Sequence, residues 1–580
     1  QYTCNDGPKG KSGHGYYEFV DNRVKVINSS STNKDQCRAT FTVEGIKADC
    51  TPSDGDGDGD GGVLPSDGNI AQAPLFLSQS AEPNVMYMLD DSGSMDRDYM
   101  PDNLSDDVRR KSPQFNTIYY NPSVTYRPWI KADGTYFPNA STTCPYHNPT
   151  ETSGSNNCKS LNINSGCNSS GCGSSYFARY YWYSGSPLNP SQEGSYVKKD
   201  LRTGQTYTGH GRERRQDCVN ASIEQCSAAE EIQNFANWYT YYRTRILAAR
   251  AGSGFAFAQQ GSNMRIGFGS LNNNKDSVDD IDVDSIISGV RPFIGEARED
   301  FYDNLYSLNP SGNTPLRRAL EDAGKYFSSD SDKGPWSDTP GEDLNDNVAE
   351  DHLACRRNYT VLMTDGYWND DAASGSAKND NDSTPGPSHS GPGGLSYNFT
   401  SESPFSDDRS NTLADVAMYY WKTDLRDDLE NVVNANAFNP AFWQHMTTYG
   451  VGFGVTGDQD PDTVFDAVLT GANIPAWGNP GSADKDKIDD LLHAAVNSRG
   501  GFANELALVL QEISQQSKSS ASSIAVNSTR LDSGTLVYQA SFNSNDWSGR
   551  IQAFTLTESG AIDSVFWDTN SAGKIPAYGS

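Results

Sequence analysis

Four short apolar runs along the chain predict buried β-strands. They cover residues 85–89, 264–268, 359–363 and 449–453. Each run is too short for an ordinary helix, and polar residues follow at once, as Asp90 does after the first run. Runs of this kind are typical of parallel strands that are buried on both faces of a sheet.

Apolar residues at helical spacing lie between these runs. Four such stripes occur, in residues 232–246, 316–327, 413–420 and 488–496. Pro315 suits the first position of the second helix. Because strands alternate with helices, we predict an α/β domain with an open, doubly wound (Rossmann-like) sheet over residues 84–517.

Four regions depart from this alternation. Residues 101–226 are rich in Tyr, Ser, Gly and Cys and are too long for a loop, which predicts an inserted, disulfide-rich subdomain. Residues 1–53 predict a small disulfide-pinned β segment, followed by an Asp/Gly-rich stretch over 54–83. Residues 518–580 predict an all-β region. It has too few strands to close by itself, so we expect a part of a longer protein or strands borrowed from elsewhere.

The charge narrows the function classes. The 580 residues include 45 Lys and Arg against 75 Asp and Glu, a formal net charge of −30. A phosphate backbone repels such a chain, so we expect no nucleic-acid partner.

No run of about 18 apolar residues occurs, so we expect no transmembrane segment. Gln1 is expected to be a mature end left by cleavage.

The ten cysteines indicate an oxidising compartment. None has CxxC spacing, which leaves structural disulfides in a secreted protein as the expectation. Three cysteines lie before residue 51, six lie between Cys144 and Cys226, and Cys355 stands alone. This grouping indicates a pair between Cys355 and one N-terminal cysteine, although the sequence leaves the connectivity open.

Three polar loops carry the candidate chemistry. Asp90, Ser92 and Ser94 form a DxSxS pattern after the first strand, Thr314 precedes a Pro-started helix, and Asp365 follows the third strand. In a doubly wound sheet these loops converge at the carboxyl edge. Hydroxyl and carboxylate oxygens favour Mg²⁺, Ca²⁺ or Mn²⁺. The serines and the threonine would bind the metal directly, and the aspartates directly or through water.

This metal site would bind a partner rather than catalyse a reaction. Few charged ligands leave the cation electrophilic, so its open position would attract a carboxylate from another molecule. The alternative is that each loop is an ordinary turn or a capped helix start, because Asp-Ser-Gly-Ser is also common turn chemistry.

A second candidate calcium site lies in the Asp/Gly-rich stretch. Asp56, Asp58, Asp60 and Asp67 occupy positions 1, 3, 5 and 12 of an EF-hand-like loop, with Gly61 at position 6. No convincing helix flanks the loop, and Asp-Gly repeats also form flexible linkers. The sequence leaves calcium loop and linker open.

The other polar residues are expected to have structural rather than catalytic roles. No GxSxG, HExxH or P-loop pattern occurs, so we expect no enzyme. His445 and His493 lie in apolar helical stretches and are expected to be packed in the core. The acidic run 380–382 is expected to be solvated surface.

The three-loop pattern resembles the metal-ion-dependent adhesion site of von Willebrand factor A domains. Further stretches resemble the type IV pilus tip-associated adhesins of the PilC/PilY family. They are residues 121–122, 126–129, 235–239, 241–245, 363–369, 413–420, 442–446 and 489–497. The resemblance runs from about residue 84 to the end of the chain, whereas the first 80 residues resemble no family pattern.

The resemblance implies a secreted protein at the tip of a type IV pilus, on the outer surface of a Gram-negative cell. Its implied partners are minor pilins and a host or abiotic surface ligand, and residues 518–580 would begin a C-terminal propeller. One hypothesis is an adhesin and assembly factor that binds surfaces or proteins through the metal site. The alternative is a structural protein that caps minor pilins, in which the metal supports only the fold.

Overall fold

The computed structural model describes the chain from residue 81 to residue 516 with short gaps, together with the backbone of six outer strands. The gaps are 151–156, 164–175, 186–189, 191, 276, 343–351, 370, 437, 473 and 504–505. Contacts divide the chain into two units, Gln1–Ala48 and Asp49–Ser580. In the first, strands β1 (Gly15–Val20) and β2 (Arg23–Asn28) pair antiparallel.

The second unit is built around a six-stranded, mostly parallel sheet. Its order is β11 (Ile286–Pro292), β10 (Arg265–Ser270), β3 (Asn84–Leu89), β12 (Asn358–Thr364), β15 (Met446–Gly452) and β16 (Phe502–Ala503). All neighbours pair parallel except the edge strand β11. Counted along the chain the order is 3-2-1-4-5-6, which is typical of a doubly wound sheet and changes direction between β3 and β12.

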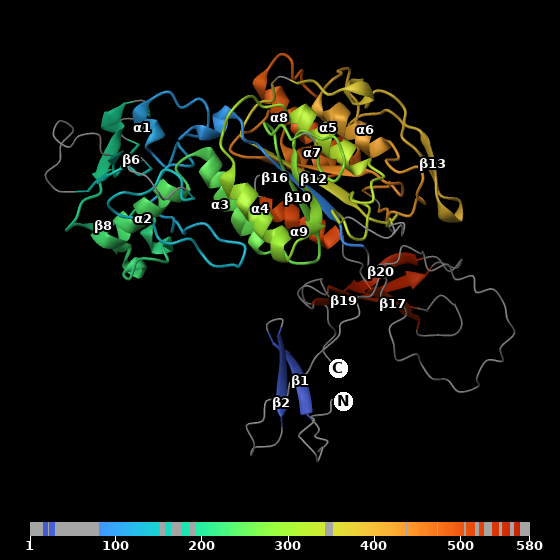
Figure 1. Ribbon diagram of the computed structural model, residues 1–580, viewed down its shortest axis with the longest axis horizontal. Helices are drawn as coiled ribbons and strands as arrows, with labels where there is room; N and C mark the ends of the chain where they lie inside the picture. The colour runs from blue at the N-terminus through green and yellow to red at the C-terminus, as the bar shows by residue number, and fades with distance from the viewer. Residues whose placement is uncertain are drawn as a thin grey trace. The chain divides into compact units, whose positions relative to one another are not determined.

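Side chains of the central strands alternate between two cores, one on each face of the sheet. In β3, Tyr87 packs in one core and Met86 and Met88 in the other. The first core also contains side chains of α3 (Arg245–Ala258), α4 (Gly295–Ser307) and α9 (Leu506–Gln516). The second contains side chains of α5 (Leu316–Phe327), α6 (Leu413–Lys422) and α8 (Asp484–Asn497), and α7 (Pro461–Thr470) packs on α8. Figure 1 shows α3, α4 and α9 on one side of the sheet and α5, α6 and α8 on the other.

The strands and helices predicted from the apolar pattern are present, with two corrections. The stripe over 232–246 is not one helix, because α2 (Ala228–Tyr241) ends before α3 begins. At Tyr242 the backbone leaves helical geometry, and the Arg245 amide donates to Arg97 O at 3.0 Å. The second correction is small: Pro315 caps α5 and is not its first helical residue.

Residues 101–226 and α2 contribute many aromatic side chains to the first core, the one that also contains α3. This region contains a short helix, α1, six strands in pairs and two described disulfides, Cys144–Cys158 and Cys218–Cys226. Cys355, farther along the chain, is also disulfide-bonded. The elements are α1 (Asp107–Arg110), β4 (Leu161–Asn162), β5 (Tyr176–Phe177), β6 (Arg179–Tyr183), β7 (Tyr196–Asp200), β8 (Thr206–Thr208) and β9 (Gln225–Ser227).

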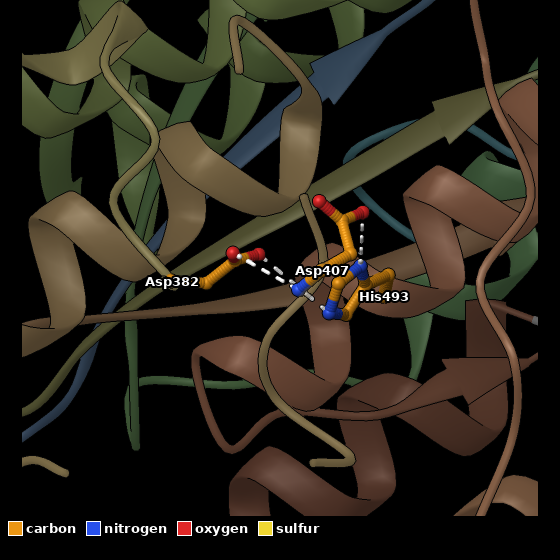
Figure 2. Close-up of side chains that lie close together, drawn as sticks. All are labelled: Asp382, Asp407 and His493. Carbon is orange, nitrogen blue, oxygen red and sulfur yellow. Dashed lines mark hydrogen bonds and ion pairs between the residues drawn. The ribbon is translucent and has the colours of Figure 1, made fainter. Parts of the chain in front are cut away.

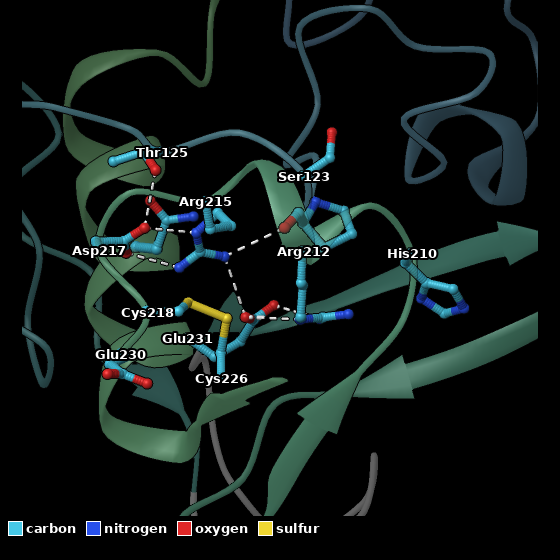
Figure 3. Close-up of polar contacts among 12 residues, drawn as sticks. Ser123, Thr125, His210, Arg212, Arg215, Asp217, Cys218, Cys226, Glu230 and Glu231 are labelled. Atoms are coloured by element: carbon cyan, nitrogen blue, oxygen red, sulfur yellow. Dashed lines mark hydrogen bonds and ion pairs between the residues drawn. A yellow bond between two sulfur atoms is a disulfide. The ribbon is translucent and has the colours of Figure 1, made fainter. Parts of the chain in front are cut away.

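A buried ion network links this region to α2. Figure 3 shows Glu231 between Arg212 and Arg215. Glu231 pairs with Arg212 at 2.6 Å and with Arg215 at 3.2 Å, and all three side chains are fully buried. Arg215 also pairs with Asp217 at 2.6 Å, next to the disulfide at Cys218.

Two further sets of strands complete the described backbone. A small hairpin of β13 (Ser388–Ser390) and β14 (Ser396–Asn398) lies between β12 and α6 in the sequence. The predicted β-rich region forms a four-stranded antiparallel sheet in which the strands follow chain order. These strands are β17 (Ala521–Val526), β18 (Leu536–Asn543), β19 (Ser548–Leu556) and β20 (Ile562–Asp568).

Candidate metal-binding site

The candidate site lies where the two central strands of the sheet end. β3 ends at Leu89 and β12 at Thr364, and the Asp90 amide donates to Met363 O at 2.9 Å. Asp90 and Asp365 therefore follow adjacent parallel strands at the point where the sheet changes direction. Doubly wound sheets bind ligands in this place because the loops diverge there to opposite faces.

Hydrogen bonds join four of the five residues that the sequence singled out. The Ser92 amide donates to Asp90 Oδ1 at 2.8 Å, and the Ser92 and Ser94 hydroxyl oxygens are 2.8 Å apart. The Ser94 hydroxyl donates to Asp365 Oδ1 at 2.9 Å. The fold thus brings together oxygen atoms from residues 271 positions apart in the chain.

Thr314 lies on a third loop that contacts the other two. The Gly93 amide donates to Gly312 O at 3.1 Å, and the Thr314 amide donates to Asn369 Oδ1 at 3.0 Å. Gly312 has a φ of +72°, and a Cβ atom there would lie 2.4 Å from Asn272 Oδ1. A glycine is therefore needed at this position beside Asn272. The amide of Ser311 also donates to Asp91 O at 2.7 Å, so backbone contacts hold the Thr314 loop against the DxSxS loop.

Two buried carboxylates make this site favourable for a positive charge. Asp90 and Asp365 are both fully buried, and the Thr364 hydroxyl donates to Asp90 Oδ2 at 2.6 Å. Burial, and then the charge of Asp365, raise the pKa of Asp90 to about 7. Burial also raises the pKa of Asp365, an effect that Arg245 opposes.

Arg245 is the residue of this site that the sequence reasoning missed. Its Nη1 donates to Asp365 Oδ2 at 2.8 Å, its Nε donates to Tyr99 O at 2.9 Å, and it also forms an ion pair with Asp102. The guanidinium is buried and holds Asp365 against the loop that follows the DxSxS pattern. The only signal for it was the stretch 241–245, one of the sequence stretches that resemble the PilC/PilY family.

The raised pKa of Asp90 predicts the pH dependence of the metal-free protein. In the folded state Asp90 keeps its proton up to about pH 7, whereas in the unfolded chain it releases the proton near pH 3.8. The contribution of Asp90 to the free energy of unfolding is therefore complete below pH 3.8 and is lost as the pH rises through about 7. In EDTA we therefore expect the contribution of Asp90 to the melting temperature to fall between about pH 4 and about pH 7. Asp90→Asn should make the fall shallower, while Asp382 and Asp415, whose pKa values burial also raises, keep their part of it. A fall as steep as in the wild type would contradict the assignment to Asp90.

The structure also brings together acidic residues that the sequence reasoning placed elsewhere. The expectation that residues 380–382 are solvated surface is wrong for Asp382, which is fully buried beside Asp407 and His493. His445 and His493 are buried as expected. The possible calcium loop at Asp56, Asp58, Asp60 and Asp67 lies outside the described residues.

Comparisons with known proteins identify similar chains. Over 87% of its length the chain is 31% identical to the type IV pilus biogenesis factor PilY1 of Pseudomonas aeruginosa strain PAK. It is 27% identical, over the same share, to PilY1 of strain UCBPP-PA14. In each case it covers 45% of the relative, so the chain spans about half the length of the curated relatives it matches.

Solved structures and family models give no further information on the fold of this chain. The crystal structure of the pilus adhesin SpaC from Lactobacillus rhamnosus GG aligns with 52% of this chain and 34% of that chain, at 10% identity. Its TM-score of 0.22 is too low to bear on the fold. No family model matches the chain. Among the described helices, none has both the length and the apolar character that a bilayer crossing requires.

Proposed function

The chain belongs to the PilC/PilY family, and from this premise we propose that it is an adhesin and assembly factor of a type IV pilus. Its α/β domain, which we take to be a von Willebrand factor A domain, binds an acidic group of a surface or protein ligand. A divalent cation mediates the contact. The ligands of this cation are Asp90, Ser92, Ser94, Thr314 and Asp365.

One observation carries the proposal: the hydroxyls of Ser92 and Ser94 and the carboxylate of Asp365 form one hydrogen-bonded chain at the switch point of the sheet. All the donors are oxygen atoms, which suits Mg²⁺, Ca²⁺ or Mn²⁺. The proposal is supported by burial and the nearby charge of Asp365, which raise the pKa of Asp90 and would make a neutralising positive charge favourable at this place. The residues present therefore fit a hard cation.

Each residue has a distinct part in this mechanism. The hydroxyls of Ser92, Ser94 and Thr314 bind without adding charge, and Asp90 and Asp365 supply the negative charge. When bound, the cation acts as a Lewis acid that attracts an external carboxylate. Arg245 holds Asp365 in position through its 2.8 Å contact and offsets part of its charge, which keeps the net charge of the site small.

The wider setting follows from the family. The protein is secreted, acts at the pilus tip on the outer surface of the cell and contacts minor pilins there. The antiparallel sheet β17–β20 is the first part of a propeller-like domain, since four antiparallel strands in chain order make one blade. The Asp56–Asp67 stretch binds calcium, and the chain needs no enzymatic activity for any of these roles.

Thr314→Ala separates adhesion from assembly. We expect this variant to bind Mn²⁺ at least about tenfold more weakly, as loss of a metal ligand does, and to abolish chelator-sensitive attachment of piliated cells. Pili should still form. Thr117→Ala, which removes the hydroxyl of an exposed threonine, is the matched control.

The measurements are calorimetric Mn²⁺ binding by the purified chain, counts of pili, and attachment with and without EDTA. Lost pili with a folded, secreted variant would favour the structural role, in which the chain caps minor pilins and the metal supports only the fold. Unchanged Mn²⁺ affinity in Thr314→Ala would exclude Thr314 as a ligand.

A further inference from the structure

A second group of acidic residues converges on the opposite face of the sheet from α3, in the layer of α6 and α8. Asp382 and Asp407 belong to the long segment between β12 and α6, and His493 belongs to α8. Figure 2 shows the two carboxylates approaching the imidazole of His493 from different sides. His493 Nε2 lies 3.7 Å from Asp382 Oδ2, and its Nδ1 lies 3.7 Å from Asp407 Oδ2.

The negative charge in this group exceeds the positive charge nearby. Asp382 also forms a group with Asp380 and Asp415, and within each group the ligand atoms lie within 4.8 Å of one another. Opposite oxygen ligands of Ca²⁺ are about 4.8 Å apart, twice the usual bond length. Lys422 lies among these carboxylates but donates to Asn381 O, Thr384 O and Thr384 Oγ1, all uncharged acceptors.

His493 is uncharged, and its Nδ1 is a hydrogen-bond acceptor that faces this group. Its Nε2 lies 2.8 Å from Phe405 O, and since a carbonyl only accepts, this nitrogen carries the hydrogen. Burial lowers the pKa of His493 to about 3, so the ring is neutral. A neutral ring protonated at Nε2 turns the lone pair of Nδ1 toward the carboxylate of Asp407.

An independent observation comes from Asn497, which is fully buried on α8. Its Nδ2 donates to Asp382 Oδ2 at 3.0 Å and to Ala414 O at 3.2 Å, so the orientation of the amide is determined by two acceptors. The amide oxygen of the same group has no hydrogen-bond partner. The amide nitrogen of Asn497 contacts Asp382, while its amide oxygen is buried and unpaired, which is costly. A cation held next to Asp382 would satisfy this oxygen.

We propose that Asp382, Asp407 and the amide oxygen of Asn497 hold a calcium ion, with Asp380 on its solvent side. The donor atoms are mainly carboxylate and amide oxygens, which Ca²⁺ prefers, and weak calcium sites are typical of extracellular modules. The ion joins the segment between β12 and α6 to helix α8. It lies apart from the Asp90 site and does not depend on it.

A shared proton is the competing explanation. Burial, and then the charges of Asp415 and Asp407, raise the pKa of Asp382 to about 8, so without a cation this carboxyl group is protonated at neutral pH. A proton on Asp382 reduces the repulsion but leaves the amide oxygen of Asn497 unpaired. The two explanations predict different results for one variant.

Asp382→Asn tests the proposal in the full chain. We expect the EDTA-treated variant to melt at about the same temperature as the wild type, because without a cation the substitution replaces one neutral group by another of similar shape. In Ca²⁺ the variant should bind one fewer ion per chain by equilibrium dialysis and lose part of the Ca²⁺-induced rise in melting temperature. Asp408→Asn changes the same charge on an adjacent, 82% exposed side chain and should alter neither value.

Asp407→Asn provides a second test if the first variant does not fold, and the same loss of one ion is expected. The proposal is overturned if the wild type and both Asp382→Asn and Asp407→Asn bind equal numbers of Ca²⁺, or if Asp408→Asn loses as much. Displacement of this ion by equimolar Zn²⁺, abolished by His493→Gln, would assign the site to a softer metal and overturn calcium.

Discussion

Glu231→Ala is expected to lower the free energy of unfolding by about 3–5 kcal/mol, the usual cost of breaking a buried ion pair from one side. Glu231 is bonded to Arg212 and Arg215, and none of these three side chains is exposed. The hydroxyl of Tyr120 also donates to Glu231 at 2.8 Å. Without Glu231, two guanidinium groups would remain buried with less than their full set of acceptors.

Denaturant unfolding monitored by tyrosine and tryptophan fluorescence measures this effect. Glu213→Ala is the matched control, because Glu213 lies between the same arginines in the sequence but its side chain is 44% exposed. Its effect should stay below about 1 kcal/mol. Equal unfolding midpoints for the two variants would show that the network adds no stability.

Arg245→Met is expected to destabilise the metal-free protein by a similar amount, about 3–5 kcal/mol. The arginine is buried and pairs with Asp365, so its loss leaves that carboxylate and Asp90 in one buried site without a counter-charge. Divalent cations should therefore stabilise the variant more than the wild type. This prediction rests on the proposed metal site, because the cation would replace the positive charge that the arginine supplied.

Melting temperatures in EDTA and in Mn²⁺ test both parts of the prediction. Arg97→Met is the control: Arg97 also pairs with Asp102, at 2.6 Å, but it is 42% exposed and has no described contact with Asp365. It should change stability by less than about 1 kcal/mol and leave the response to Mn²⁺ unaltered. A fall in stability for Arg245→Met that Mn²⁺ leaves unchanged would argue against a cation between Asp90 and Asp365.

Local patterns were enough to predict four of the six strands of the sheet (β3, β10, β12 and β15) and the placement of the candidate loops, whereas the edge strands β11 and β16 were not predicted. The run 85–89 is apolar at every position because both faces of β3 are buried, and the polar residues after it therefore mark the edge of the sheet. The same reasoning placed Asp365 after β12. The break at Tyr242 was missed because the apolar spacing continues across it, although α2 packs in the inserted region and α3 packs on the sheet.

The sequence by itself determined the alternation of strands and helices, the family, and the residues of three loops that meet at one edge of the sheet. Only the tertiary structure decided which buried polar groups meet: Arg245 with Asp365, and Asp382 with Asn497 of α8. Periodicity encodes burial over a few residues, and so it can be read locally. An ion pair depends on a distance between groups that lie 120 positions apart, and only the folded chain sets that distance.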